Sequence, residues 1–260
     1  MSESGLPFAG LLLASDWDGT LSVEGNIPAE NLRAIREFQD GGGYFTVISG
    51  RTPDYLSECF AGFFPNTYTV GLNGARIEDL RTGEVLYDGF CDDGMLPPLS
   101  AMMRGADEIC QVIFYRTDGN QILTPEEAKR ELLHLSPKTI YKTVFLTKTP
   151  EGASHLLSLA EATPHDGYEV VRSFPTGVEL LSEKSGKGAA LMRLKQALGA
   201  RCAIAVGDFE NDISLLRAAD IGYAVRDGAP SLLAVAHRCV CPAREGAIAD
   251  VIKDIKKRGV

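Results

Sequence analysis

Residues 15–21 read Ser15-Asp16-Trp17-Asp18-Gly19-Thr20-Leu21, directly after the apolar run from Phe8 to Ala14. Such a run predicts a buried strand, and a strand that leads into two carboxylates is unusual because charged groups oppose burial. Alternate residues of an extended chain point the same way, so Asp16 and Asp18 should face one small volume. Two anions there repel unless a cation or a shared proton intervenes. The stretch therefore predicts an active site at the carboxyl edge of a sheet, with Trp17 facing away into the core.

The composition is that of a soluble globular protein. The chain has 260 residues, of which 45% are hydrophobic and 23% are charged, enough for one large domain or for a domain with a sizeable insertion. The net charge of -9 argues against a nucleic-acid partner, because phosphate backbones attract Lys and Arg. No run reaches the roughly 18 apolar residues of a membrane span, and no basic residue precedes the apolar run at Phe8 as in a signal peptide. We therefore expect a cytoplasmic protein without a membrane partner, and a monomer.

Strands and helices alternate over the first third of the chain and again from Gly177 to the last helix. In the first part we expect strands at 11–16, 44–48 and 67–72, with helices at 29–39 and 53–60. In the last part we expect strands at 178–181, 202–206 and 221–225, with helices at 187–198, 211–218 and 248–257. This alternation predicts parallel β-α-β units.

The rhythm changes between these two parts. A hairpin is expected over 75–87, strands near 111–115, 141–147 and 168–174, and helices near 98–106, 125–134 and 151–162. These elements suggest an antiparallel sheet with helices. We therefore expect an α/β protein with a Rossmann-like parallel-sheet core, residues 1–78 and 177–260, that carries helices on both faces. An α+β cap domain, residues 79–176, would be inserted into this core.

Four polar clusters lie at or just after predicted strands of the α/β part. They are Asp16 with Asp18, Ser49 with Gly50, Lys187, and Asp208 with Asn211 and Asp212. Each cluster also has an ordinary explanation. Asp16 and Asp18 could form a turn, and Ser49 could be a helix N-cap. Lys187 could be a solvated surface residue, and Asp208 and Asp212 could be acids that match a helix dipole. Because strand ends of a parallel sheet converge at one edge, the conjunction of all four favours a site over four independent surface features.

Several acids and one lysine, with no histidine in the clusters, indicate phosphoryl transfer. Carboxylate and carbonyl oxygens are the ligands that Mg²⁺ prefers, and Mg²⁺ takes substrate phosphate as a further ligand. A carboxylate can attack phosphorus and form an aspartyl-phosphate. Lys187 and the metal would neutralise the transferring group, while Ser49 and the Gly50 amide would hold its oxygens. A second acid would protonate the leaving alcohol and then activate water.

The motifs occur in a specific order along the chain. They are Asp16-Trp17-Asp18-Gly19-Thr20-Leu21, Ile48-Ser49-Gly50-Arg51, Leu72-Asn73-Gly74-Ala75, Ser185-Gly186-Lys187-Gly188 and Gly207-Asp208-Phe209-Glu210-Asn211-Asp212. Together they resemble the haloacid dehalogenase superfamily of phosphatases, in the Cof-like branch with a large C2-type cap. The resemblance spans essentially the whole chain, because Glu245-Gly246-Ala247 before the last helix also fits.

This resemblance implies a role for each motif residue. Asp16 would be the nucleophile and Asp18 the acid/base. Substrate phosphate would be held by Ser49, Gly50, Lys187 and Asn211. Magnesium would be held by the Asp16 carboxylate, the Asp18 backbone carbonyl and Asp208. Thr20, Asn73 and Asp212 would support these groups, and Asn211 would also lie at the metal site.

The expected function is a Mg²⁺-dependent phosphatase that acts on a small phosphorylated metabolite, with sugar phosphates as the leading class. Two alternatives stay open: a phosphomannomutase-like phosphotransferase that delivers the phosphoryl group to a sugar hydroxyl, and a non-catalytic sensor on the same scaffold. The cap should cover the sheet edge and set specificity. Its polar candidates are Arg116, Asp118, Lys142 and Arg172, although such charges are more often solvated surface groups.

Overall fold

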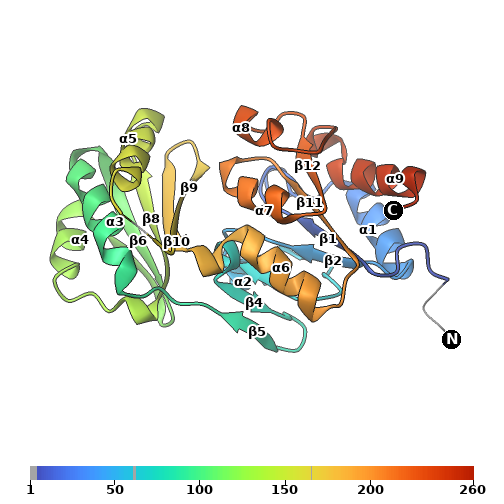
Figure 1. Cartoon of the computed structure of the whole chain (residues 1–260), viewed down its shortest axis with the longest axis horizontal. Coiled ribbons are helices and arrows are strands. Elements are labelled where there is room, and N and C mark those ends of the chain that lie inside the picture. Colours follow the sequence, from blue (N-terminus) through green and yellow to red (C-terminus); the bar gives the residue numbers. More distant parts are fainter. Residues whose placement is uncertain (1–4, 61–62, 165) are drawn as a thin grey trace. The chain divides into compact units, whose positions relative to one another are not determined.

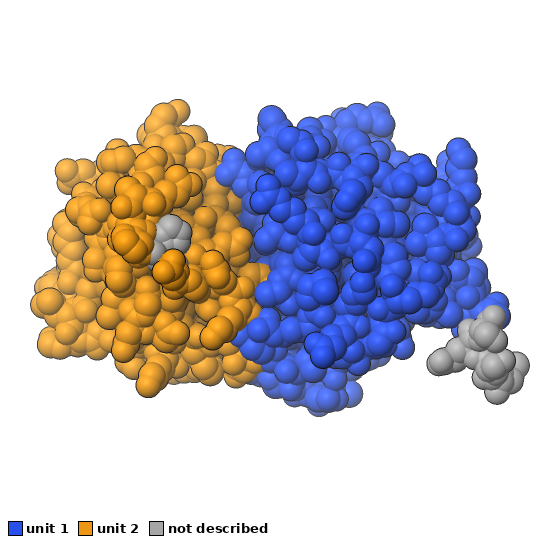
Figure 2. Space-filling view, in the orientation of Figure 1, with its two compact units in different colours: residues 1–87, 187–260 blue, residues 88–186 orange. Residues whose placement is uncertain are grey.

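The computed structural model describes residues 5–60, 63–164 and 166–260. The chain forms two compact units (Figure 2). Unit 1 comprises Met1–Tyr87 and Lys187–Val260, and unit 2 comprises Asp88–Gly186. The sequence-based boundaries at 78/79 and 176/177 differ from these divisions. Residues 79–87 of the expected cap lie in unit 1, and residues 177–186 of the expected core lie in unit 2.

Unit 1 is built on a five-stranded parallel sheet with the order β13-β12-β11-β1-β2. Its strands are β1 (Leu11–Ser15), β2 (Tyr44–Val47), β11 (Cys202–Gly207), β12 (Ile221–Val225) and β13 (Arg238–Val240). Every residue of β1 is buried, which explains why this strand is an unbroken apolar run rather than an alternating one. The predicted α/β class is confirmed.

Helices cover both faces of this sheet (Figure 1). One face packs against α1 (Ala29–Asp40), α2 (Pro53–Cys59) and α9 (Ala247–Arg258), and the other against α6 (Lys187–Ala197), α7 (Ile213–Ala218) and α8 (Pro230–Leu233). Alternate residues of β1 divide accordingly, with Leu13 in the first apolar cluster and Leu12 in the second. Trp17 is 1% exposed in the first cluster and lies edge-on to Phe60, with ring centroids 5.5 Å apart. Its predicted core role is confirmed.

The expected hairpin is present, but in unit 1 rather than in the insertion. A second sheet has the order β3-β4-β5, with strands β3 (Thr69–Gly71), β4 (Arg76–Glu78) and β5 (Val85–Asp88). Val70 of β3 forms a parallel bridge with Ile48, just beyond β2, and β4 pairs antiparallel with β3. These pairings attach the hairpin to the parallel sheet.

Unit 2 has an antiparallel sheet with the order β7-β6-β8-β10-β9. Its strands are β6 (Ile109–Arg116), β7 (Gly119–Leu123), β8 (Ile140–Thr147), β9 (Tyr168–Phe174) and β10 (Gly177–Ser182). Its helices are α3 (Leu96–Met102), α4 (Pro125–Glu131) and α5 (Pro150–Glu161), and they share an apolar cluster with the sheet (Figure 1). The predicted α+β character of the inserted segment is therefore observed.

One strand lies in a different sheet from the one expected. Residues 178–181 were assigned to the α/β core, whereas β10 pairs antiparallel with β8 and β9. Val178 and Leu180 belong to the apolar cluster of unit 2. A short apolar strand has the same local pattern in either sheet, so only long-range pairing distinguishes the two. No helix in the described part of the chain has the length and apolar character needed to cross a membrane.

Candidate active site

The predicted polar clusters follow neighbouring strands of unit 1. Parallel pairing aligns Ser15 of β1 with Val206 of β11 on one side and with Val47 of β2 on the other. Asp16 and Asp208 therefore leave the sheet side by side, and Ser49 follows two residues after β2. This register brings three of the clusters to one sheet edge, as parallel strand ends require.

Lys187 joins two of the acids. It is the first residue of α6 and is 1% exposed. Its Nζ donates to Asp16 Oδ1 at 2.7 Å and to Asp212 Oδ1 at 2.5 Å. The alternative of a solvated surface lysine is wrong, because a buried ammonium is found only where anions compensate its charge.

Asp212 holds Lys187 and the neighbouring turn together. Its carboxylate is fully buried in the short helix η6 (Glu210–Asp212). While Oδ1 accepts from Lys187, Oδ2 accepts from the backbone N–H groups of Asp208 at 3.0 Å and Phe209 at 3.3 Å. A Cβ on Gly207 would lie 2.5 Å from Asp212 Oδ2, so glycine is needed at that position.

The loop after β1 cradles Asp208. Thr20 Oγ1, which is buried, donates to Asp208 Oδ1 at 3.1 Å. Gly19 has a φ of +75°, and a Cβ at this position would lie 2.4 Å from Asp208 Oδ2. The glycine therefore serves both the left-handed turn and the close approach of the carboxylate.

Burial and crowding of like charges shift the pKa values of these acids. Burial raises the pKa of Asp16 well above its ordinary value, and Asp212 and Asp208 raise it further, while Lys187 opposes the shift. Burial followed by the charge of Asp212 raises the pKa of Asp208 to about 6. Burial opposes the charge on Lys187, but Asp16 and Asp212 outweigh it and raise the pKa of the ammonium. One lysine therefore does not neutralise the three carboxylates.

These acids fit a divalent cation. Carboxylate oxygens of Asp16, Asp208 and Asp212 lie within 4.8 Å of one another. Oxygen-only donors suit Mg²⁺. The raised pKa values of Asp16 and Asp208 reflect burial first and crowding of like charges second, and a bound cation would offset both effects. Because both Asp212 oxygens already accept hydrogen bonds, Asp16 and Asp208 are the better candidates for metal ligands.

The predicted phosphate loop is tied to a second motif. Ser49 is 1% exposed, and its Oγ accepts the backbone N–H of Arg51 at 3.1 Å. The Ser49 carbonyl accepts the backbone N–H of Asn73 at 2.8 Å. Asn73 has a φ of +56° and is buried, and its Oδ1 would lie 3.2 Å from a Cβ on Gly50. Asn73 thus lies directly against the loop.

Asp18 and Asn211 lie outside the buried cluster. The Asp18 side chain is 53% exposed and pairs with Arg51, whose Nε lies 2.8 Å from Asp18 Oδ2. Asn211, on η6, is half-buried, and no hydrogen bond joins its side chain to the described cluster. Arg51 belongs to the Ile48-Ser49-Gly50-Arg51 motif, but the sequence predicts no role for it. Its position directly after Ser49-Gly50 was the available signal.

The four polar candidates of the insertion all lie in unit 2, and most have partners there. Arg116 Nη2 donates to Glu131 at 2.7 Å, and Arg172 Nη2 donates to Ser154 Oγ at 2.6 Å. Lys142 is 2% exposed and donates to Glu179 at 2.6 Å, so the expectation of a solvated charge is wrong for this residue. Asp118 is exposed in the turn between β6 and β7.

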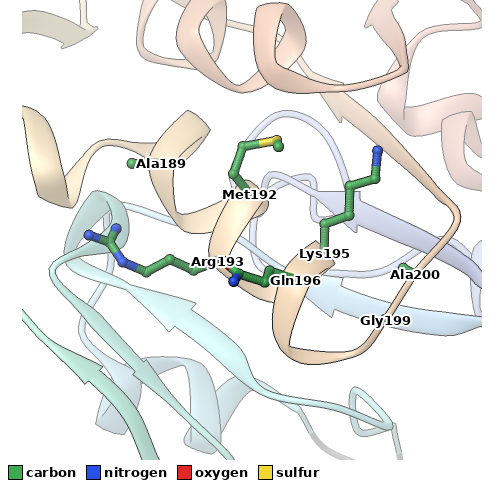
Figure 3. A pocket seen from close by; sticks show the side chains of 7 residues that line it. All are labelled: Ala189, Met192, Arg193, Lys195, Gln196, Gly199 and Ala200. Carbon is green, nitrogen blue, oxygen red and sulfur yellow. The ribbon is translucent and has the colours of Figure 1, made fainter.

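A hollow lies over α6 (Figure 3). Met192, Arg193 and Lys195 contribute to its lining, and none of the predicted site residues does. Arg193 lies over the ring of Tyr87, 3.8 Å from its centroid, and Lys195 pairs with Asp220 at 2.6 Å. The hollow therefore presents no group with a catalytic arrangement.

Comparison with known proteins gives consistent results. A sequence profile of the haloacid dehalogenase-like hydrolases matches residues 13–252. The chain is 26% identical over 217 residues to the 5-amino-6-(5-phospho-D-ribitylamino)uracil phosphatase YcsE of Bacillus subtilis, covering 82% of this chain and 83% of that protein. The structure of a haloacid dehalogenase-like hydrolase from B. subtilis aligns with a TM-score of 0.77 at 22% identity, covering 93% of this chain and 98% of that one. A subclass IIB sugar phosphatase, BT4131, aligns with a TM-score of 0.74 at 22% identity, covering 95% and 98%.

Proposed function

This chain belongs to the haloacid dehalogenase-like hydrolases, in the Cof-like branch, and is a phosphatase; we propose that it hydrolyses a small phosphorylated metabolite through a phosphorylated Asp16. The observation that carries this proposal is the buried bridge from Lys187 to Asp16 and Asp212 beside Asp208. This bridge places the Lys187 ammonium against the Asp16 carboxylate at the end of a strand. A nucleophile that attacks an anionic ester requires such a positive charge beside it.

In the proposed first step, a carboxylate oxygen of Asp16 bonds to phosphorus as the bond from phosphorus to the leaving oxygen breaks. Asp18 gives a proton to that oxygen. In the second step, water loses a proton to Asp18 and attacks the phosphorus, which releases inorganic phosphate and restores Asp16. Lys187, the Ser49 hydroxyl and the Gly50 amide would stabilise the transferring oxygens.

The proposed cofactor is Mg²⁺, held by the carboxylates of Asp16 and Asp208 and by the Asp18 backbone carbonyl. When bound, the ion neutralises negative charge on the phosphoryl group and on these acids. Asp212 would keep Lys187 and the Asp208 turn in place rather than bind the metal, because both of its oxygens are occupied.

A sugar or sugar-alcohol phosphate is the proposed substrate class. Two similar proteins support it by name: one is a sugar phosphatase and the other acts on a phosphorylated ribityl compound. Such a leaving group is a poorly acidic alcohol, so it requires the proton that Asp18 would supply.

The proposal is tested with Asp16→Asn, which keeps the shape of the side chain and removes the nucleophile. We expect hydrolysis of p-nitrophenyl phosphate with Mg²⁺ to fall by more than about 10³-fold. Mass spectrometry after an acid quench should find one phosphoryl group on the peptide that contains Asp16 in the wild type only. Asp40→Asn, at an exposed position of α1, is the matched control and should retain full activity.

Near-wild-type turnover by Asp16→Asn would overturn the nucleophile assignment. Assay of a hexose 1-phosphate separates the hydrolase from a phosphotransferase. Free phosphate supports hydrolysis, and isomerised sugar phosphate would replace the proposal by a mutase.

A further inference from the structure

The exposed pair of Arg51 and Asp18 is a two-bond fork that joins two separate loops. Arg51 Nε donates to Asp18 Oδ2 at 2.8 Å, and Arg51 Nη2 donates to Asp18 Oδ1 at 3.1 Å. Both carboxylate oxygens are thus held by one planar fork, an arrangement that fixes the orientation of the carboxylate as well as its distance.

Arg51 is itself anchored to the phosphate loop. Its backbone N–H donates to Ser49 Oγ at 3.1 Å, and its carbonyl accepts from Leu72 N–H at 2.8 Å. The guanidinium lies over the ring of Tyr55 in the first turn of α2, 4.8 Å from the ring centroid. The fork is therefore supported from the β2–α2 turn, whereas Asp18 belongs to the separate loop after β1.

This pair contributes little to the stability of the fold. The side chains of Arg51 and Asp18 are 49% and 53% exposed, so water and salt screen much of their attraction. Its effect is instead to join the loop that carries the acid/base to the loop that carries the phosphate ligands. Catalysis by a general acid depends on such alignment, because a misplaced proton donor loses most of its effect.

We propose that Arg51 is a positioning residue that aims the Asp18 carboxyl group at the leaving oxygen. This inference rests on the proposed function of Asp18. When substrate binds, one of the two hydrogen bonds between Arg51 and Asp18 is replaced by a hydrogen bond from Asp18 to the leaving oxygen. The other keeps the Asp18 carboxyl group in its orientation. A direct phosphate contact by Arg51 is the competing role, and the two roles predict different dependence on the leaving group.

Two substrates distinguish the roles. Ethyl phosphate needs a proton on its leaving alcohol, whereas p-nitrophenolate leaves as a stable anion. The two esters are compared by kcat/KM, which covers the steps up to phosphorylation of Asp16 and leaves out the later water attack that both esters share. If Arg51 acts through Asp18, Arg51→Met should lower kcat/KM for ethyl phosphate by about 10- to 100-fold, part of the full effect of a general acid. It should change kcat/KM for p-nitrophenyl phosphate by less than about 3-fold.

Three further variants complete the experiment. Arg51→Lys keeps the charge without the fork and should restore only part of the ethyl phosphate activity. In an Asp18→Asn background, Arg51→Met should have no additional effect. Arg81→Met removes another two-bond fork, Arg81 Nε to Asp79 Oδ1 at 3.0 Å and Arg81 Nη2 to Asp79 Oδ2 at 2.7 Å, in the turn between β4 and β5, and should not alter either rate.

Equal losses of kcat/KM with both esters would overturn the positioning role in favour of phosphate binding. No loss with either ester would exclude both roles. If the Asp16→Asn variant kept its activity, the proposed function would fail. That result is distinct from the results that would overturn the role of Arg51. Matching thermal unfolding of the Arg51 variants and the wild type shows that the fold is retained.

Discussion

At the scale of single residues, the side chains of the site are held in place by hydrogen bonds to one another. Lys187 donates one hydrogen bond to Asp16 and one to Asp212, and Asp212 also accepts from the backbone N–H groups at the start of the Asp208 turn. Removal of one partner from such a buried pair leaves an uncompensated charge, at a cost of about 3–5 kcal/mol. Loss of any one of these side chains should therefore destabilise unit 1.

Gly19 and Gly25 form a matched pair for testing the approach of Asp208. Both have positive φ, +75° and +79°, so Gly→Ala should cost about 1–2 kcal/mol of backbone strain at either position. Only at Gly19 would the new Cβ meet Asp208, at 2.4 Å, whereas nothing lies within 4 Å of it at Gly25. We expect Gly19→Ala to weaken Mg²⁺ activation by more than about 10-fold, as loss of a metal-supporting contact does, and Gly25→Ala to leave it unchanged.

The test titrates phosphatase activity with Mg²⁺ for both variants and follows their thermal unfolding. Equal Mg²⁺ dependence in the two variants would show that Asp208 does not need the space at Gly19.

At the scale of elements, α6 places Lys187 through its close contact with α7. Gly188, the second residue of α6, lies against the backbone of α7, where a Cβ would be 2.5 Å from the Ser214 carbonyl oxygen. The absence of a side chain therefore determines how near the start of α6 comes to α7. This proximity fixes the position from which the Lys187 side chain reaches Asp16 and Asp212.

Gly188→Ala should move the start of α6 away from α7. Overpacking of this kind costs about 1–3 kcal/mol, and the displacement of Lys187 should lower kcat more than it raises KM. Met192→Ala, on the same helix at a 46% exposed position, is the control and should change the free energy of unfolding by less than about 0.5 kcal/mol. Urea unfolding and steady-state kinetics measure both effects. A destabilised but fully active Gly188→Ala would separate the helix contact from the placement of Lys187.

At the scale of the whole molecule, the acid cluster should make stability depend on pH in a definite direction. The folded pKa of Asp208, about 6, lies above its ordinary value of 3.8, and the pKa of Asp16 is shifted the same way. A raised carboxyl pKa favours the protonated folded state, so this contribution is complete below about pH 4 and is lost as the pH rises through about 6. For Asp208 the loss amounts to at most about 3 kcal/mol.

Mg²⁺ should therefore stabilise the protein more at pH 8 than at pH 5, because protons compete with the ion for the same oxygens at the lower pH. Thermal unfolding in EDTA and in Mg²⁺ at the two pH values tests this expectation. Asp208→Asn removes one titrating group and should flatten the pH dependence of the metal-free protein. An equal Mg²⁺-induced rise in Tm at both pH values would contradict the assigned cluster.

The order of strands and helices could be predicted from the sequence because the strongest signals are local. The unbroken apolar run of β1, the alternation of strands with helices, and the glycines that end them predicted the α/β core and the helices on both of its faces. The boundaries between unit 1 and unit 2 could not be predicted as closely. The hairpin of β4 and β5 lies in unit 1, and β10 lies in unit 2, because each is placed by a partner strand distant in sequence.

The sequence by itself determined that Asp16, Ser49 and Asp208 meet, since each follows a strand of one parallel sheet and parallel strand ends converge whatever the side-chain details. Only the tertiary structure decided how they meet: that Lys187 is shared by Asp16 and Asp212, that Gly19 makes room for Asp208, and that Arg51 holds Asp18. The physical reason is the distance along the sequence over which each kind of interaction acts. A strand or turn is specified by neighbouring residues, whereas a hydrogen bond between loops depends on the packing of the whole unit and leaves no local pattern.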